Sequence, residues 1–325
     1  MSDILIETVA RSNVGKRRGN NEDNFYLGGE NVNSLNDKIV RTDLSEEGFT
    51  AVLDGMGGES SGEKASLISA MACDELKNEL LDSEFSDESI LHLFNKANSD
   101  VCDEIVKIQK RMGSTLVLLG VKNNQITIAN IGDSRAYLYR NGELKQISKD
   151  HTEAQTMVDA GLISWEDSQS IKEKHKLTQH IGIFEEEMII EPYIKRFSGQ
   201  VNDKILLCSD GLTDMLTNEE IKTLLDSDDN AENIVNNLVE AALDKGGKDN
   251  VTVNLSIIKS NKKEKKILPF LCIILAIVLL ITTSVGIYAY NKNKENKGNN
   301  KTAETEVFNA ENTDKPKRNI LGYFI

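Results

Sequence analysis

The sequence lacks several patterns that would assign it to a class of protein at once. Its four cysteines form no C-x-x-C pair, so they are interpreted as small buried apolar residues in a reducing compartment. No G-x-x-x-x-G-K followed by Ser or Thr occurs, which argues against a P-loop nucleotide site. The four histidines show no metal-ligand spacing. Only His151 falls near a plausible site, whereas His175 and His180 lie in a polar segment and are expected to be solvated.

Basic residues are scarce over most of the chain. Removing the 11 basic and 6 acidic residues that follow position 260 leaves 27 basic and 46 acidic residues, a net charge of −19. A nucleic-acid-binding protein needs a basic face, so this balance argues against that class. The excess of carboxylates instead suggests that some of them are gathered to bind cations.

An apolar run is absent from the N-terminus, which argues against a signal peptide, but one occurs near the C-terminus. Residues 267–290 carry no charge over 24 positions, more than the roughly 20 residues that cross a bilayer. We therefore predict a domain at 1–259, a basic juxtamembrane linker at 260–266, a transmembrane helix at 267–290 and a polar, disordered tail at 291–325.

The orientation of this single membrane span follows from charge and from the bulk of the preceding domain. Lysines flank the apolar run on both sides, so the tendency of basic flanks to stay cytoplasmic gives only a weak bias. A large N-terminal unit without an export signal is expected to stay inside. We therefore expect a cytoplasmic domain, anchored in the cell membrane, with the tail outside.

The first 259 residues mix helix and strand patterns without a strict βαβ rhythm, and no internal repeats are found. Helical spacing at 63–81 and 87–109 predicts a consecutive pair of helices. Residues 114–148 are rich in β-forming residues, and the Asn-Gly pair at 141–142 is a strong hairpin signal. Antiparallel sheets combined with consecutive helix pairs predict an α+β sandwich with helices outside two sheets.

Aspartates recur where predicted strands begin or end, beside Gly or Asn. One such aspartate would be uninformative, because aspartate is common at turns. Several brought together repel one another, unless cations are bound or their pKa values are raised. Oxygen ligands suit Mg²⁺ or Mn²⁺ rather than zinc. The candidate metal-binding residues are Asp23, Asp54, Asp133, Asp210 and Asp249.

The neighbours of these aspartates suggest what such cations would do. Gly55 lacks a Cβ, so its carbonyl can turn toward a cation. Two cations that share a carboxylate lie about 4 Å apart and hold a water or hydroxide between them as a nucleophile. Arg17 and Arg18 stand within a few residues of Glu22 and Asp23, and an arginine fork matches a phosphate. The sequence therefore predicts metal-assisted attack on a phosphoester.

Six motifs in order resemble the type 2C metal-dependent serine/threonine protein phosphatases, in their bacterial form. They are GKRRGNNED, LDGMGG, GSTLV, ANIGDSRAYL, LCSDGLTDML and KDNVTV, and the resemblance spans residues 8–258. It implies an αββα sandwich of two antiparallel sheets flanked by helix pairs, with a dinuclear site at one end. It also implies direct hydrolysis of phosphoserine and phosphothreonine in proteins by a hydroxide that bridges two Mn²⁺ or Mg²⁺ ions.

The resemblance also implies roles for individual residues. Asp54 would bridge both ions, and Gly55 would offer its carbonyl oxygen to one of them. Asp210 and Asp249 would bind the other ion. Asp133, together with Asp210, matches the position of a third, weaker ion in similar bacterial enzymes, which leaves a third cation open.

Further positions match groups around the metals. Glu22 and Asp23 would hold metal-bound waters in the outer shell. Arg18, rather than Arg17, matches the residue that grips the phosphoryl group. The polar insertion at 150–185 corresponds to a flap near the active site.

Two departures from the pattern bear on mechanism and on substrate choice. Met56 stands where eukaryotic relatives often carry a histidine considered as the general acid, so a metal-bound water should protonate the leaving oxygen. The segment KEKHKLTQHIG lacks a frequent Pro-x-Arg-Asn spacing, which puts flap contacts and substrate preference in doubt.

Alternatives to this function stay open at this point. The resemblance implies that the enzyme opposes a membrane serine/threonine kinase, so that kinase and its phosphorylated targets are the expected partners. One alternative is a catalytically silent, phosphatase-like binding or regulatory module at the membrane. Another is a metal-dependent hydrolase of a different phosphoester.

Overall fold

The computed structural model describes residues 4–31, 38–57, 61–168, 171–261 and 275–295. The chain divides into two compact units, Met1–Lys262 and Lys263–Ile325. The first unit carries all the candidate site residues, and the second contains the predicted membrane span. The two units are described separately.

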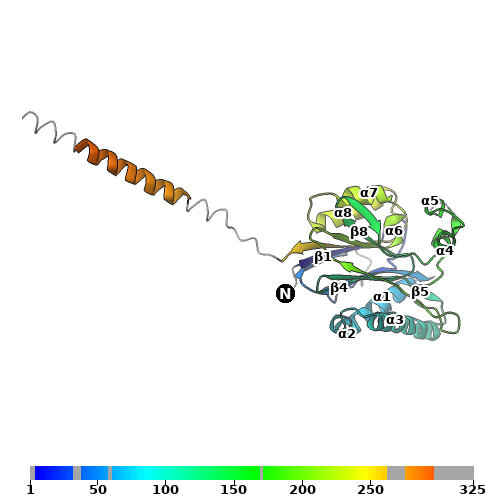
Figure 1. The fold of residues 1–325 in the computed structure, drawn as a ribbon. Helices are drawn as coiled ribbons and strands as arrows, with labels where there is room; N and C mark the ends of the chain where they lie inside the picture. Colours follow the sequence, from blue (N-terminus) through cyan, green and yellow to red (C-terminus); the bar gives the residue numbers. More distant parts are fainter. Residues whose placement is uncertain (1–3, 32–37, 58–60, 169–170, 262–274, 296–325) are drawn as a thin grey trace, which may run out of the picture. The chain divides into compact units, whose positions relative to one another are not determined.

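Two antiparallel sheets lie one on the other in the first unit (Figure 1). In spatial order, the first sheet contains β3 (Lys38–Ser45), β1 (Ile4–Asn13), β12 (Val251–Ser260), β11 (Lys204–Cys208), β8 (Arg135–Arg140) and β9 (Glu143–Gln146). The second contains β10 (Tyr193–Ser198), β7 (Gln125–Ile131), β6 (Leu116–Lys122), β4 (Gly48–Gly57) and β2 (Asp23–Leu27), and β5 (Met112–Ser114) pairs with β4. The β8–β9 hairpin turns at Asn141 and Gly142, as predicted.

Helices cover the outer faces of both sheets (Figure 1). One group comprises α1 (Ser61–Glu75), α2 (Lys77–Asp82) and α3 (Asp87–Ile108), and the other comprises α6 (Asp210–Thr213), α7 (Asn218–Leu225) and α8 (Ala231–Asp244). The helix predicted at 63–81 is in fact two, α1 and α2, which meet at Leu76. The Leu76 N–H donates to the Ala72 carbonyl, and the Leu76 carbonyl accepts from the Leu80 N–H. The helical hydrogen bonds therefore continue through the junction, and the interruption is local. The αββα sandwich is confirmed.

Local sequence explains where the helices begin and which face they bury. Ser86 caps α3, its side chain accepting from the Ser89 N–H. Apolar residues of α3 then recur every three or four positions and are buried. The predicted capping box between Thr217 and Glu220 is present at the start of α7.

Apolar side chains fill the space between the sheets and beneath each helix layer. The facing sheets bury Val52, Val117, Ile126, Ile205 and Leu207 in one cluster. Separate clusters join α1 and α3 to the second sheet and α8 to the first. With both faces of each sheet packed, the strand ends are where polar groups can gather.

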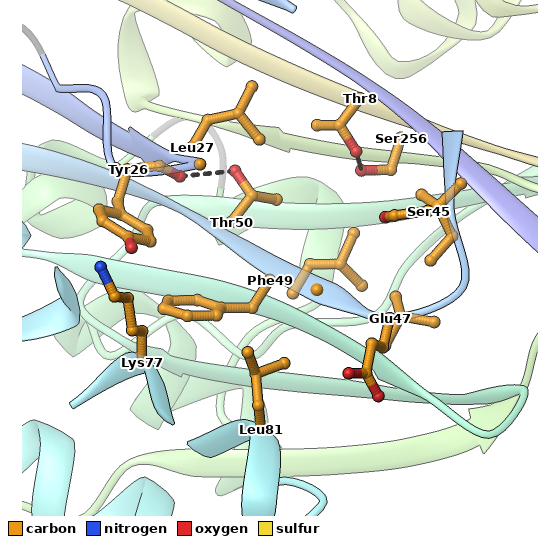
Figure 2. A pocket seen from close by; sticks show the side chains of 16 residues that line it. Thr8, Tyr26, Leu27, Ser45, Glu47, Phe49, Thr50, Lys77, Leu81 and Ser256 are labelled. Atoms are coloured by element: carbon orange, nitrogen blue, oxygen red, sulfur yellow. Dashed lines mark hydrogen bonds between the residues drawn. The ribbon is translucent and has the colours of Figure 1, made fainter. Parts of the chain in front are cut away.

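One end of β2 and β4 borders a mainly apolar cavity, whose lining also includes Glu47 and Lys77 (Figure 2). This cavity of about 350 Å³ is lined by residues that include Leu27, Phe49, Thr50 and Leu119. The Phe49 ring stacks on that of Tyr26 with ring centroids 4.9 Å apart. The Thr50 hydroxyl donates to the Tyr26 carbonyl at 2.8 Å, and the hydroxyls of Thr8 and Ser256, which also line the cavity, share a hydrogen bond of 2.8 Å.

The segment between β9 and β10 carries short helical pieces, as expected for the polar insertion. They are α4 (Glu153–Asp159), α5 (Trp165–Ser168) and the 3₁₀ helix η1 (Lys172–His175). Isolated bridges join Thr152 to Leu177 and Ser114 to Ile181. We call residues 152–181 the flap segment, and these bridges fasten it to itself and to β5.

The described part of the second unit is one helix, Leu275–Glu295. It has 21 residues, and an 18-residue window within it has a mean hydropathy of 1.4, so it is long and apolar enough to cross a membrane by length and composition. It continues five residues beyond the predicted end at 290, whereas 267–274 of the predicted span lie outside the described residues. The predicted tail at 291–325 is described only as far as Glu295.

Candidate metal centre

Strand pairing brings the first carboxylates together. Asp23, the first residue of β2, lies opposite Asp54 near the end of β4. Glu22 precedes β2, and its backbone carbonyl accepts from the Gly55 N–H at 3.1 Å. Glu22 and Asp23 therefore lie beside Asp54, although Asp54 is 31 positions further along the chain than Asp23.

The other sheet contributes its carboxylates from strand ends that meet β2. Asp210 follows β11 as the first residue of α6, and Asp249 precedes β12. The hydroxyl of Ser209 donates to Asp23 Oδ2 at 2.7 Å, which joins the two sheets. The Asn250 side chain also joins them, since its Oδ1 accepts from the Glu22 N–H at 2.8 Å.

A cavity of about 550 Å³ opens where these strand ends meet. Asp133 reaches it from the turn between β7 and β8. Asp23 lies behind the cavity surface and is only 2% exposed. Of the sequence-predicted site residues, those that line the cavity are Arg18, Glu22, Asp54, Gly55, Asp133, Asp210 and Asp249.

The carboxylates crowd one another enough to resist ionisation. Burial raises the pKa of Asp23 to about 7. Burial and then the nearby Asp133 raise the pKa of Asp210 to about 8. The pKa of Asp54 is raised well above its ordinary value by burial, then by Asp23 and Asp210. Such a set of oxygen donors fits hard divalent cations, which would neutralise the charge that the fold concentrates here.

Two glycines allow the backbones around the site to approach closely. A Cβ on Gly55 would lie 2.1 Å from the Gly62 carbonyl oxygen. Gly15 has a φ of +79°, and a Cβ there would lie 2.1 Å from the Asp249 carbonyl oxygen. Neither position admits a side chain. The start of α1 can therefore lie against β4, and the loop between β1 and β2, which carries Arg18, can lie against Asp249.

Arg18 is the arginine that reaches the cavity. Its Nη2 donates to Asp249 Oδ2 at 2.6 Å, and its Nη1 lies 3.6 Å from Glu22 Oε2. Its side chain remains 46% exposed, so the guanidinium is accessible from the cavity. Arg17 is exposed and does not line the cavity.

Two histidines of the flap segment lie closer to the carboxylates than the sequence suggested. His175 is exposed, as expected, but its ring also faces Asp133, Asp210 and Asp214. Asp133 and then Asp214 raise the pKa of His175 to about 10. His180 also lines the cavity, and its Nδ1 lies 2.8 Å from the Ile181 carbonyl oxygen. The spacing of histidines in the sequence could not show that the flap segment folds back over the aspartates.

His151, the histidine favoured from sequence, has a different position. It does not line the cavity. Its backbone N–H donates to the Gly132 carbonyl at 3.0 Å, and the Gly132 N–H donates to its Nδ1 at 3.2 Å. These bonds fix the turn that presents Asp133.

Comparisons with known proteins show the family to which this two-sheet fold belongs. The family model for protein phosphatase 2C matches residues 10–157. The serine/threonine phosphatase stp of Listeria monocytogenes is 33% identical over 251 residues, which cover 75% of this chain and 93% of the relative. The chain belongs to the protein phosphatase 2C family.

A longer relative and its solved structures extend the comparison. The serine/threonine protein phosphatase PstP of Mycobacterium tuberculosis is 34% identical over 258 residues. The match covers 77% of this chain but 44% of PstP, so the chain spans less than half the length of that relative. A crystal structure of PstP superposes with a TM-score of 0.66 at 32% identity, covering 78% of this chain and 99% of that one.

Another solved structure bears on the metals. The catalytic domain of PstP in complex with two manganese ions matches with a TM-score of 0.64 at 32% identity, covering 79% of this chain and all of that one. The predicted family, its fold and the use of manganese by its members are thereby confirmed. So is the enzyme class at the level of the family, that of serine/threonine protein phosphatases.

Proposed function

We propose that residues 1–259 of this chain hydrolyse phosphoserine and phosphothreonine in proteins. The observation that carries the proposal is the convergence of Asp54, Asp210 and Asp249 with Arg18 on one cavity. These residues come from β4, α6 and the start of β12, and from the loop before β2. If Arg17 and Arg18 were only an ordinary pair of surface arginines, the contacts of Arg18 with Asp249 and Glu22 would have no explanation.

Asp54, Gly55, Asp210 and Asp249 would hold two Mn²⁺ or Mg²⁺ ions, and Asp133 a third. When bound, such ions supply a water activated at neutral pH and neutralise charge on a phosphoryl group. Asp23 and Glu22 orient water around them. The Glu22 carboxylate is held by the Gly62 N–H, and the Asp23 carboxylate by Ser209.

Arg18 binds the phosphoryl group of the substrate. Its guanidinium is planar and presents paired N–H donors, which match two phosphoryl oxygens. It now binds Asp249 and Glu22, so it is held at the cavity before substrate arrives. Developing negative charge on the phosphoryl oxygens strengthens these contacts in the transition state.

Protonation of the leaving oxygen falls to water in this cavity. Met56 lines the cavity beside Gly55, and its thioether has no proton to donate. The described cysteines also offer no reactive nucleophile, because burial raises the pKa of Cys73 and that of Cys208 to about 12 and that of Cys102 to about 11. Direct hydrolysis without a phosphoenzyme is consistent with both observations.

An assay separates this function from the alternatives. The full chain in detergent is tested on p-nitrophenyl phosphate, a phosphothreonine peptide and a nucleoside triphosphate, with Mn²⁺ and then with EDTA. We expect Mn²⁺-dependent release from the first two substrates. A folded chain that binds Mn²⁺ but releases no phosphate would favour the silent binding module, and preference for the nucleotide would favour another phosphoesterase.

We propose further that the helix Leu275–Glu295 anchors the enzyme to the cell membrane, with the phosphatase domain in the cytoplasm and the tail outside. Its length and composition support this, and it would hold the enzyme near a membrane serine/threonine kinase and its targets at a raised effective concentration. Protease treatment of intact cells tests the orientation. Cleavage of the tail with retention of the domain is expected, and cleavage of the domain would contradict it.

A further inference from the structure

His175 of the flap segment faces two of the site aspartates at distances that a hydrogen bond does not explain. Its Nδ1 lies 3.8 Å from Asp133 Oδ2 and 3.6 Å from Asp210 Oδ2. Hydrogen bonds between nitrogen and oxygen are about 2.7–3.2 Å long. One ligand atom from each of the three residues lies within 4.8 Å of the other two.

These separations suit three ligands around one cation. Metal–ligand bonds of about 2.1 Å place two ligands about 3.0 Å apart at a right angle and about 4.2 Å apart when opposite. The observed 3.6 and 3.8 Å fall between these limits. A cation could therefore sit between the ring and the carboxylates without moving the flap segment.

The far side of the ring is oriented by a third carboxylate. His175 Nε2 lies 3.2 Å from Asp214 Oδ2, and Lys174 Nζ donates to Asp214 Oδ1 at 3.0 Å. Asp214 caps α6, which begins at Asp210. Metal-binding histidines usually donate their second ring N–H to such a carboxylate, which directs the lone pair of the other nitrogen at the metal.

A small polar cavity of about 20 Å³ adjoins this group and is lined by Asp133, His175, Asp210 and Asp214. That volume admits about one water-sized sphere. Arg135 also lines it, but its charge is already balanced, since Nε and Nη2 both donate to Asp150. Lys174 lines it too and is paired with Asp214, which leaves Asp133 and Asp210, the two carboxylates that face His175 Nδ1, without a Lys or Arg partner among these residues.

We propose that His175 is a nitrogen ligand of a divalent transition-metal ion that it shares with Asp133 and Asp210, and that Asp214 positions its ring. The proposal rests on the proposed function, since it places Asp210 at the edge of the same metal centre. On binding, the Nδ1 proton leaves to solvent and the nitrogen lone pair forms the bond to the ion. An imidazole ligand favours Mn²⁺ over Mg²⁺ and ties the flap segment to the catalytic end of the sandwich.

The test uses the full chain in detergent, freed of metal by chelation and titrated with Mn²⁺ alone or Mg²⁺ alone by calorimetry. We compare wild type with His175→Gln, Asp214→Asn and the control His92→Gln. His92 pairs with Glu79 outside the cavity. Electron spin-echo spectroscopy of bound Mn²⁺ reports directly on a nitrogen ligand.

We expect His175→Gln to weaken the weakest class of Mn²⁺ site at least about tenfold and Mg²⁺ binding less than about twofold, with loss of the nitrogen signal. Asp214→Asn should weaken Mn²⁺ binding about tenfold while keeping that signal, and His92→Gln should change nothing. Circular dichroism confirms that each variant is folded.

An unchanged Mn²⁺ affinity in His175→Gln, an equal loss for both ions, or no nitrogen signal in wild type would overturn the proposal. His175 would then be only a positive counterion of the aspartates. The two tighter Mn²⁺ sites and peptide turnover are measured in the same samples. Their absence in wild type would sink the proposed function instead, so the two failures are distinguishable.

Discussion

The strands β2 and β4 have two contrasting ends. At one end Asp23 lies opposite Asp54, and at the other Leu27 lies opposite Thr50. The first end opens on the carboxylate-lined cavity and the second on a mainly apolar cavity (Figure 2). Burial of the apolar end is favourable without any ligand, whereas burial of the charged end raises carboxyl pKa values and therefore costs free energy. The fold places its reactive groups where they are unstable alone and leaves stability to the opposite end.

The largest effect should come from the charged end. Asp54→Asn removes the carboxylate proposed to join both cations while keeping its size. We expect turnover of a phosphothreonine peptide to fall at least about 10³-fold, with a melting temperature equal to or above that of the metal-free wild type, because a source of repulsion is gone. The matched control is Asp228→Asn, an exposed aspartate before α8. Turnover within threefold of wild type in Asp54→Asn would show that this carboxylate is not needed.

The charged end should also set how stability depends on pH when metal is removed. Burial raises the pKa of Asp23 to about 7 and that of Asp210 to about 8, against about 4 in an unfolded chain. Each therefore holds its proton more tightly when folded. Their contribution to stability is fully present below about pH 4 and is lost as the pH rises through 7–8. The raised pKa of His175 acts in the same direction.

We therefore expect the melting temperature of the EDTA-treated chain to fall by about 5 °C or more from pH 5 to pH 8. Mn²⁺ should reverse this trend, since the cations replace the protons. The variant Asp23→Asn should show a shallower slope. A melting temperature that is constant or rises over this range without metal would mean that burial does not raise the pKa values of these carboxyl groups in the folded chain.

The carboxylates at strand ends could be predicted from the sequence because each stands in a recognisable local pattern. Asp54 and Asp210 stand where an apolar run is followed by glycine. Asp23 and Asp54 are opposite one another in register, so antiparallel pairing of their strands is enough to bring them together. The αββα order followed from the hairpin and helix-pair signals together with the family motifs. Local chemistry and fold pointed the same way for these residues.

The residues that the sequence did not reveal make contacts across long sequence separations, and no local sequence pattern marks them. Asn250 contacts Glu22 from 228 positions away, and Ser209 contacts Asp23 from 186 positions away. An asparagine or serine beside a strand is otherwise an ordinary turn residue. The contacts of His175 with the aspartates were missed because a polar insertion gives no periodicity from which its packing can be predicted. Its partners come from the β7–β8 turn and α6.

A change at the apolar end should give the opposite result to Asp54→Asn. Phe49 stacks on Tyr26 and meets Phe85 edge-on at 6.2 Å. We expect Phe49→Ala to lower the free energy of unfolding by about 2–3 kcal/mol, seen by urea titration, with turnover per folded molecule within twofold of wild type. Leu162→Ala, at a side chain that is 74% exposed, is the control without effect. A large loss of turnover in the folded Phe49 variant would mean that the two ends are coupled.

The smallest effect should come from Arg18→Lys, which separates charge from geometry within the charged end. Lysine keeps the positive charge near Asp249 but cannot make two parallel hydrogen bonds to a phosphoryl group. We expect kcat/KM for the phosphothreonine peptide to fall about tenfold, close to 1.4 kcal/mol, with Mn²⁺ affinity unchanged. Arg17→Lys, at the exposed neighbour, should keep full activity. If both variants lost activity equally, or if Arg18→Lys chiefly weakened Mn²⁺ binding, Arg18 would serve to balance Asp249 and Glu22 rather than to bind the phosphoryl group.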